Sequence, residues 1–151
     1  MKSCFASVMI ITQKFNEDFL HDGEWYYQAM GIKGHDGIDV KPKDNRDWRM
    51  FSVFGGIVIE KRFHSIYGNR IAIWNKEKKI IEYHNHLGLF CPSVSLGDNI
   101  KKRTYLGMMG ETGKVFGAHN HFAISIANNK GERINRQNGY FGYVDPIPFL
   151  E

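Results

Sequence analysis

The stretch that decides the fold is Ala118-His119-Asn120-His121-Phe122-Ala123-Ile124-Ser125-Ile126, in which a pair of histidines leads into an apolar run. Short runs rich in β-branched and aromatic residues are typical of strands. Residues two apart in a strand point to the same face, so His119 and His121 are predicted to face one space. Taken alone, such a pair is more typical of two surface histidines on an exposed strand edge.

Comparable short runs recur along the chain, separated by many of its 16 glycines. No window has a long apolar period of 3.6, so long amphipathic helices are not expected. Short strands with glycine-rich turns predict an all-β domain. Between Asp22 and Met30 a helical turn can form, and the clustered aromatic residues Trp25, Tyr26 and Tyr27 fit a loop or a cleft wall equally well. The other predicted strands are Val8–Thr12, Gly56–Glu60, Ile71–Trp74, Ile80–Tyr83 and Tyr105–Met108.

The length and composition indicate one folded domain over residues 1–151. Hydrophobic residues make up 42% of the chain, which excludes a disordered protein. The net charge of +4 is too small to indicate a polyanion-binding protein by itself. Two cysteines, Cys4 and Cys91, are too few for a disulfide framework, and a single bridge and two buried thiols both remain open.

No apolar stretch is long enough to span a membrane. The N-terminal run Cys4–Thr12 lacks a convincing signal-peptide cleavage site, so it is interpreted as the first strand.

A second group of polar residues precedes a predicted strand in Gly34-His35-Asp36-Gly37-Ile38-Asp39. Gly37 allows the backbone to bend, so His35 and Asp39 can point toward one place. Together with either His119 or His121, they would offer two imidazoles and one carboxylate. A catalytic zinc takes three such ligands and keeps one position for water.

His84 and His86 lie at the end of the apolar run Ile80–Tyr83. Their spacing predicts that they also share a strand face. A lone histidine at this place would be structural, whereas a pair in a chain that offers a metal site suggests a role in proton transfer.

These motifs together resemble the lysostaphin-type zinc metalloendopeptidases, which cut peptidoglycan peptides. The matching pieces follow the order that they have in that family. They are His35-Asp36-Gly37-Ile38-Asp39, Phe54-Gly55-Gly56-Ile57-Val58, Tyr67-Gly68-Asn69-Arg70-Ile71-Ala72-Ile73, His86-Leu87, Leu106-Gly107-Met108-Met109-Gly110-Glu111-Thr112-Gly113, His119-Asn120-His121-Phe122 and Asp145-Pro146.

The resemblance implies a compact domain of antiparallel sheets with a metal-centred groove. It also implies roles for individual residues: zinc ligands His35, Asp39 and His121; catalytic histidines His86 and His119. His84 stands where the family has a tyrosine, which leaves His84 as an alternative to His86; His86 is favoured because Leu87 follows it. Substrate contacts are expected from Tyr26, Tyr27, His84 and Asn69.

The predicted function is therefore that of a monomeric zinc-dependent endopeptidase that acts on peptidoglycan peptides at the bacterial cell wall. A phage lysis enzyme or a tail-associated enzyme fits these features. The alternative is a catalytically silent module of the same fold that binds wall peptides. A basic nucleic-acid binder is not expected, because nothing organises Arg62, Phe63 and Tyr67 into a binding face.

Overall fold

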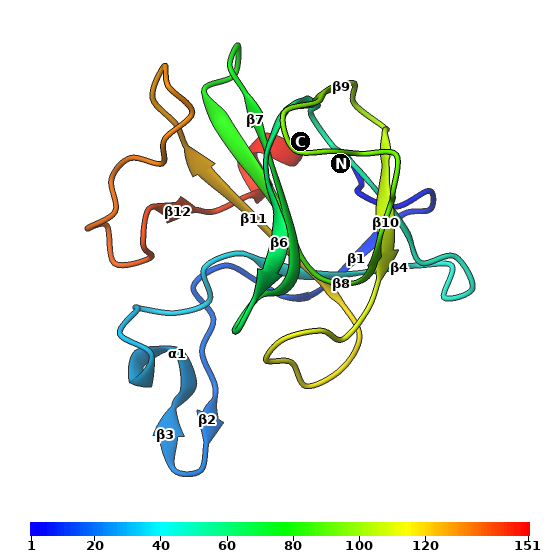
Figure 1. Cartoon of the computed structure of the whole chain (residues 1–151). Helices are drawn as coiled ribbons and strands as arrows, with labels where there is room; N and C mark the ends of the chain where they lie inside the picture. The colour runs from blue at the N-terminus through cyan, green and yellow to red at the C-terminus, as the bar shows by residue number, and fades with distance from the viewer.

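The computed structural model describes residues 1–151 and consists mainly of β-strands, with two helices of four residues each (Figure 1). The strands are β1 (Met9–Gln13), β2 (Leu20–His21), β3 (Glu24–Trp25), β4 (Ile38–Pro42), β5 (Arg49–Phe51), β6 (Gly56–His64), β7 (Gly68–Asn75), β8 (Ile80–Phe90), β9 (Asn99–Ile100), β10 (Tyr105–Met109), β11 (Asn120–Ile126) and β12 (Tyr143–Val144). The helices are α1 (Tyr26–Ala29) and α2 (Ile147–Leu150).

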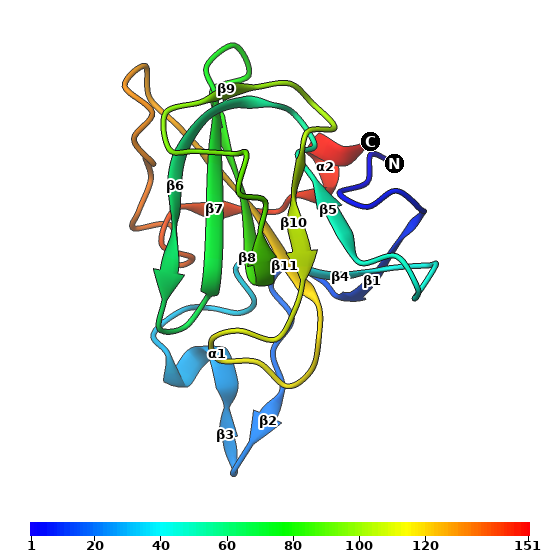
Figure 2. The same ribbon diagram turned by 45° about the vertical axis from the view of Figure 1, so that its right-hand side comes forward.

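Ten strands form one sheet, whose main path runs in the order β1-β4-β11-β8-β7-β6-β9. The sheet branches at β8, because residues 80–85 of this strand pair with β11 and residues 87–90 pair with β10. The branch lets the sheet curl, and β10 carries β5 as its other neighbour (Figures 1 and 2). Every pairing is antiparallel, so the predicted all-β antiparallel fold is confirmed.

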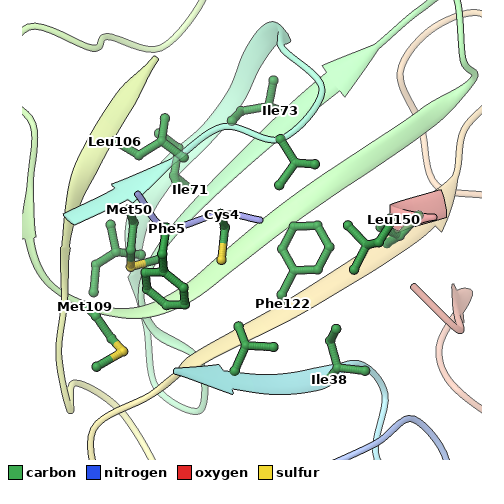
Figure 3. Close-up of a cluster of buried hydrophobic side chains, with 14 of the residues drawn as sticks. Cys4, Phe5, Ile38, Met50, Ile71, Ile73, Leu106, Met109, Phe122 and Leu150 are labelled. Atoms are coloured by element: carbon green, nitrogen blue, oxygen red, sulfur yellow. The ribbon is translucent and has the colours of Figure 1, made fainter. Parts of the chain in front are cut away.

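The main core is a cluster of 17 buried apolar residues, to which Phe122 of β11, Ile71 of β7 and Leu150 of α2 contribute (Figure 3). A second cluster of six residues, including Ile81, Tyr83 and Tyr143, covers the other face of the central strands. The central strand β8 is therefore buried on both faces from Ile80 to Leu87. This double burial explains why its first half reads as an apolar run in the sequence.

A buried polar network also lies within β8. The carboxylate of Glu82 accepts a hydrogen bond from Ser52 Oγ at 2.6 Å. It also accepts hydrogen bonds from the backbone N–H groups of Val53 and Phe54, at 3.0 and 2.7 Å. His84 Nε2 lies 3.2 Å from Glu82 Oε1, and its Nδ1 lies 3.1 Å from Asn120 Nδ2. Because buried polar groups cost free energy unless they are hydrogen-bonded, this network fixes β8 against the loop before β6.

The short hairpin of β2 and β3, followed by α1, projects from one end of the sheet (Figure 1). Of the two possibilities for the segment between Asp22 and Met30, a helical turn is present at Tyr26–Ala29. The hairpin region contacts the loop between β10 and β11, where the Phe116 ring lies 5.9 Å from Phe19 and 5.6 Å from Tyr26. Neither helix has the length and apolar character that a membrane crossing requires.

Both cysteines are free, which excludes the single bridge; of the two thiols expected to be buried, Cys4 is buried and Cys91 is half-buried. Cys4 is fully buried, and its burial raises the pKa of the thiol to about 12. Since the thiolate is the reactive species, Cys4 should resist iodoacetamide in the folded protein at pH 8, whereas the half-buried Cys91 should react. Peptide mass spectrometry after labelling measures this difference; both residues should react in denaturant, and equal labelling of the folded protein would contradict the burial of Cys4.

Candidate metal centre and groove

The loop before β4 brings His35 and Asp39 together, with His35 Nε2 at 3.0 Å from Asp39 Oδ1. The absence of a side chain at Gly37 allows this loop to approach β11 closely. A Cβ atom at Gly37 would lie 2.6 Å from the carbonyl oxygen of Phe122 and 2.9 Å from the ring of His121. Glycine is therefore required here for close approach of the backbone.

The pairing of β4 with β11 adds His121 to this pair. In the antiparallel register His121 lies directly opposite Asp39, so the two side chains share one face of the sheet. His121 Nδ1 lies 3.1 Å from Asp39 Oδ1 and 2.9 Å from His35 Nε2. Three potential ligand atoms from two distant segments thus lie within 3.1 Å of one another.

The chemistry of these three atoms fits a bound cation. His35 Nδ1 lies 3.0 Å from the carbonyl oxygen of Lys14, and His121 Nε2 lies 3.1 Å from Asp36 Oδ1, so these outer nitrogens carry the hydrogen in the neutral rings. When the inner nitrogens are unprotonated, two lone pairs lie beside a carboxylate oxygen, and the positive charge that this arrangement needs comes from a bound cation or, without one, from protons on these nitrogens. A tetrahedral zinc separates its ligand atoms by roughly 3.3–3.6 Å, close to the separations found here.

His35, Asp36 and His121 also have potential ligand atoms within 4.8 Å of one another. Asp36, however, faces Nε2 of His121, on the opposite side of the ring from Nδ1. Asp39 is therefore the carboxylate that shares a centre with both inner nitrogens.

Two further histidines border the same centre. His119 Nε2 lies 3.3 Å from Asp39 Oδ1, and the ring centroids of His86 and His119 are 4.9 Å apart. Their Nδ1 atoms lie 2.7 and 2.9 Å from the carbonyl oxygens of Thr112 and Gly117. These carbonyls accept the Nδ1 hydrogens, so each neutral ring keeps its Nε2 lone pair for other partners.

The expectation that His84 and His86 share a strand face is wrong. His86 has φ +63°, in the left-handed region, and the strand is irregular at this place. One residue in that conformation reverses the alternation of side chains, as in a β-bulge. His86 therefore lies near His121, with ring centroids 6.2 Å apart, while His84 is fully buried in the core against Phe122.

The charges in this centre shift several pKa values. Burial raises the pKa of Asp39, but hydrogen bonds from His119, His121 and His35 outweigh burial and hold it well below its usual value. Burial lowers the pKa of His121, but the carboxylates of Asp36 and Asp39 outweigh burial and raise it to about 9. Burial and the neighbouring imidazoles lower the pKa of His86 to about 3, so His86 is neutral at neutral pH.

The centre opens into a groove of about 890 Å³. Tyr26 and Tyr27 line it, and the Tyr27 hydroxyl donates a hydrogen bond to Gln13 Oε1 at 3.1 Å. The two other residues expected to contact substrate do not line the groove. His84 belongs to the core network, and Asn69 Nδ2 donates to the carbonyl oxygen of Leu87 at 3.0 Å, which ties β7 to β8.

Two residues to which the motifs assign no role, Asp36 and Tyr67, lie directly behind His121. Tyr67 donates a hydrogen bond to Asp36 Oδ2 at 2.6 Å. Burial and the Asp36 charge raise the pKa of Tyr67, so its hydroxyl stays protonated and can donate. The position of Asp36 directly after the predicted ligand His35 was the one sequence signal for its role. The sequence does not show which way the Asp36 side chain points, because this depends on the tertiary structure.

The model of Peptidase family M23 matches residues 33–136. No curated protein sequence matches the chain significantly. The catalytic domain of lysostaphin from Staphylococcus simulans has a similar structure, with TM-score 0.70 and 19% identity over 99% of this chain and 98% of that domain.

Two other solved structures are also similar. The catalytic domain of the prophage-encoded M23 protein EnpA from Enterococcus faecalis has TM-score 0.61 and 18% identity, over 89% of this chain and 93% of that one. A chain of the SpoIIQ–SpoIIIAH pore-forming complex has TM-score 0.67 and 17% identity, over 95% of this chain and 84% of that one.

The close approach at Gly37 can be tested with Gly37→Ala. We expect the added methyl group to destabilise the protein by about 1–3 kcal/mol, because neither the Phe122 carbonyl nor the His121 ring can move without disturbing β11. Urea unfolding measures the loss, and Gly88→Ala is the matched control, since its Cβ would meet nothing closer than 3.6 Å. Wild-type stability in Gly37→Ala would show that the loop does not lie this close to β11.

Proposed function

Because the chain belongs to Peptidase family M23, we propose that it is a zinc-dependent endopeptidase that hydrolyses peptide bonds in bacterial peptidoglycan. The observation that carries this proposal is the convergence of His35 Nε2, Asp39 Oδ1 and His121 Nδ1 within 3.1 Å of one another. We assign these three residues as the metal ligands. The same set that the resemblance implied is thus the set that best fits a three-ligand site with an open position.

Zinc bound by these ligands supplies a Lewis acid and a water molecule whose pKa is lowered toward neutrality. We assign His86 and His119 as the catalytic pair, because both rings border the ligand cluster and neither is needed to complete it. A neutral imidazole accepts a proton from the attacking water, and its Nε2–H form then donates that proton to the leaving amine. The second imidazole donates a hydrogen bond to the carbonyl oxygen as negative charge develops there.

His86 is suited to the accepting role at neutral pH. It is neutral there, and the carbonyl of Thr112 holds its Nδ1 hydrogen, so its Nε2 lone pair is available. His119 Nε2 lies 3.3 Å from Asp39 Oδ1, which places this ring on the other side of the ligand cluster's carboxylate as the second member of the pair.

The groove supports a peptide substrate. It adjoins the metal centre, because the three proposed ligands are among its lining residues, and Tyr26 and Tyr27 form part of its wall. Action at the cell wall follows from this substrate. A phage lysis or tail-associated enzyme accords with the fold shared with a prophage-encoded protein, and we expect a monomer.

A catalytically silent module that binds wall peptides is the second candidate. The shared fold with a chain of a pore-forming complex is the observation that favours it. A binding module, however, has no need for two additional histidines beside a complete ligand set. Zinc analysis together with a turbidity assay on purified walls separates the two, because a zinc-loaded protein that leaves every wall type intact would support the silent module.

Substitutions should divide the five residues into two groups. His35→Ala, Asp39→Ala and His121→Ala should lose both zinc and activity, because each removes one of three ligands. His86→Ala and His119→Ala should keep zinc but lower turnover by about 10²–10⁴-fold, the range expected for a general acid or base. Zinc content by elemental mass spectrometry and wall hydrolysis are the two measurements.

The control for this series is His21→Ala, because His21 is exposed and lies outside the ligand cluster. It should retain both zinc and turnover. Full activity in His86→Ala would disprove the assigned pair.

The bond that is cut can be identified by mass spectrometry of fragments from walls with different crosslinks. New amino and carboxyl ends within stem peptides or bridges are expected, and chelation followed by zinc addition should remove and then restore them. Fragments that end only in the glycan strands would contradict the endopeptidase proposal.

A further inference from the structure

Asp36 occupies an unusual position for a carboxylate that is neither ligand nor catalytic group. It is buried, with 4% of its surface exposed, and lies between His121 and Tyr67, the residue that precedes β7. Its Oδ1 lies 3.1 Å from His121 Nε2, while Nδ1 of the same ring faces Asp39 Oδ1 at 3.1 Å. The two aspartates therefore hold the His121 ring from opposite sides.

The second oxygen of Asp36 is also occupied. Oδ2 accepts the Tyr67 hydrogen bond of 2.6 Å, and the Tyr67 ring is stacked near His121 with a centroid distance of 5.8 Å and an interplanar angle of 27°. Because both oxygens have partners on the side away from the ligand cluster, Asp36 is not free to bind the metal.

Tyr67 is itself held by a buried cation. The guanidinium of Arg70 lies 4.6 Å from the centre of the Tyr67 ring and donates a hydrogen bond to the Tyr143 hydroxyl at 2.6 Å. An ion pair of 3.3 Å joins Arg70 Nε to Glu60 Oε1. A continuous set of contacts thus runs from β6 and β7 through Tyr67 and Asp36 to His121.

We propose that Asp36 and Tyr67 are positioning residues that fix the orientation of His121, so that its Nδ1 lone pair points at the metal. This inference rests on the proposed function. A carboxylate on the far nitrogen of a ligating imidazole fixes its tautomer and raises its basicity.

His121 is the ligand at which this device can be tested. The far nitrogen of the other ligand imidazole, His35, lies against the backbone carbonyl of Lys14, which no substitution removes. The partner of His121 is the side chain of Asp36, and Tyr67 is linked to Asp36 by one hydrogen bond. A substitution at Asp36 or at Tyr67 therefore removes each contact separately.

The experiment measures zinc affinity of the full chain by competition with a chromogenic chelator. Asp36→Asn should weaken binding by about 10–100-fold, the range found when such outer partners are changed. Tyr67→Phe should weaken it in the same direction but less, because Asp36 remains. In the Asp36→Asn background, Tyr67→Phe should have little further effect, since it acts through the carboxylate.

Tyr83→Phe is the matched control. It removes a hydroxyl from another buried tyrosine of the same sheet, one that is hydrogen-bonded to Ser125 Oγ at 3.0 Å and has no contact with Asp36. It should bind zinc as the unmodified chain does. Thermal unfolding in chelator shows whether each variant is folded, and the visible spectrum of the cobalt form shows whether the coordination number is retained.

Three results would overturn the inference. Unchanged affinity in Asp36→Asn would remove any role for this residue. Loss of metal as complete as in Asp39→Asn, with a changed cobalt spectrum, would make Asp36 a ligand. If the unmodified chain takes up no metal, the proposed function and the inference both fail. If the unmodified chain binds zinc and the variants bind it with the same affinity, only the inference fails.

Discussion

The antiparallel pairing of β4 with β11 is the constraint on which the rest of the site depends. It places His121 opposite Asp39, and a shift of one strand by one residue would put the two side chains on opposite faces of the sheet. Asp39 Oδ1 is the common point of the centre, at 3.0 Å from His35, 3.1 Å from His121 and 3.3 Å from His119. His35 and His119 lie in the segments that lead into β4 and β11, so the pairing of these two strands brings all three imidazoles to one oxygen.

This concentration of polar groups in a buried place would be costly without partners for their outer atoms. The partners are largely backbone carbonyls, from Lys14 for His35, Thr112 for His86 and Gly117 for His119. Two of the three carbonyls belong to the loop between β10 and β11. The same loop carries a wall of the groove, so the shape of the groove and the orientation of the proposed catalytic histidines depend on one segment.

Behind the metal centre, His121 is packed against polar and aromatic groups and not against apolar side chains. Arg70, Tyr67 and Asp36 connect the inner strands to His121, and each is buried or half-buried. Such a chain is stable because every charge in it meets an opposite charge, a hydroxyl or an aromatic face. Rigid support of this kind is what a metal ligand needs if its geometry is to be set before the metal arrives.

The sequence by itself determined the strand class, the family and the residue types of the site, because alternation, glycine turns and ligand spacing are local properties of the chain. It could not determine that the side chains of His84 and His86 point to different places. The left-handed backbone at His86 reverses the alternation of side chains along β8, and no local sequence signal predicts this conformation. Nor could it show that Asn69 is structural or that Asp36 faces His121, because these contacts join segments 18 and 85 residues apart. Only the tertiary structure decided them, since the register of paired strands and the packing of loops set which distant atoms meet.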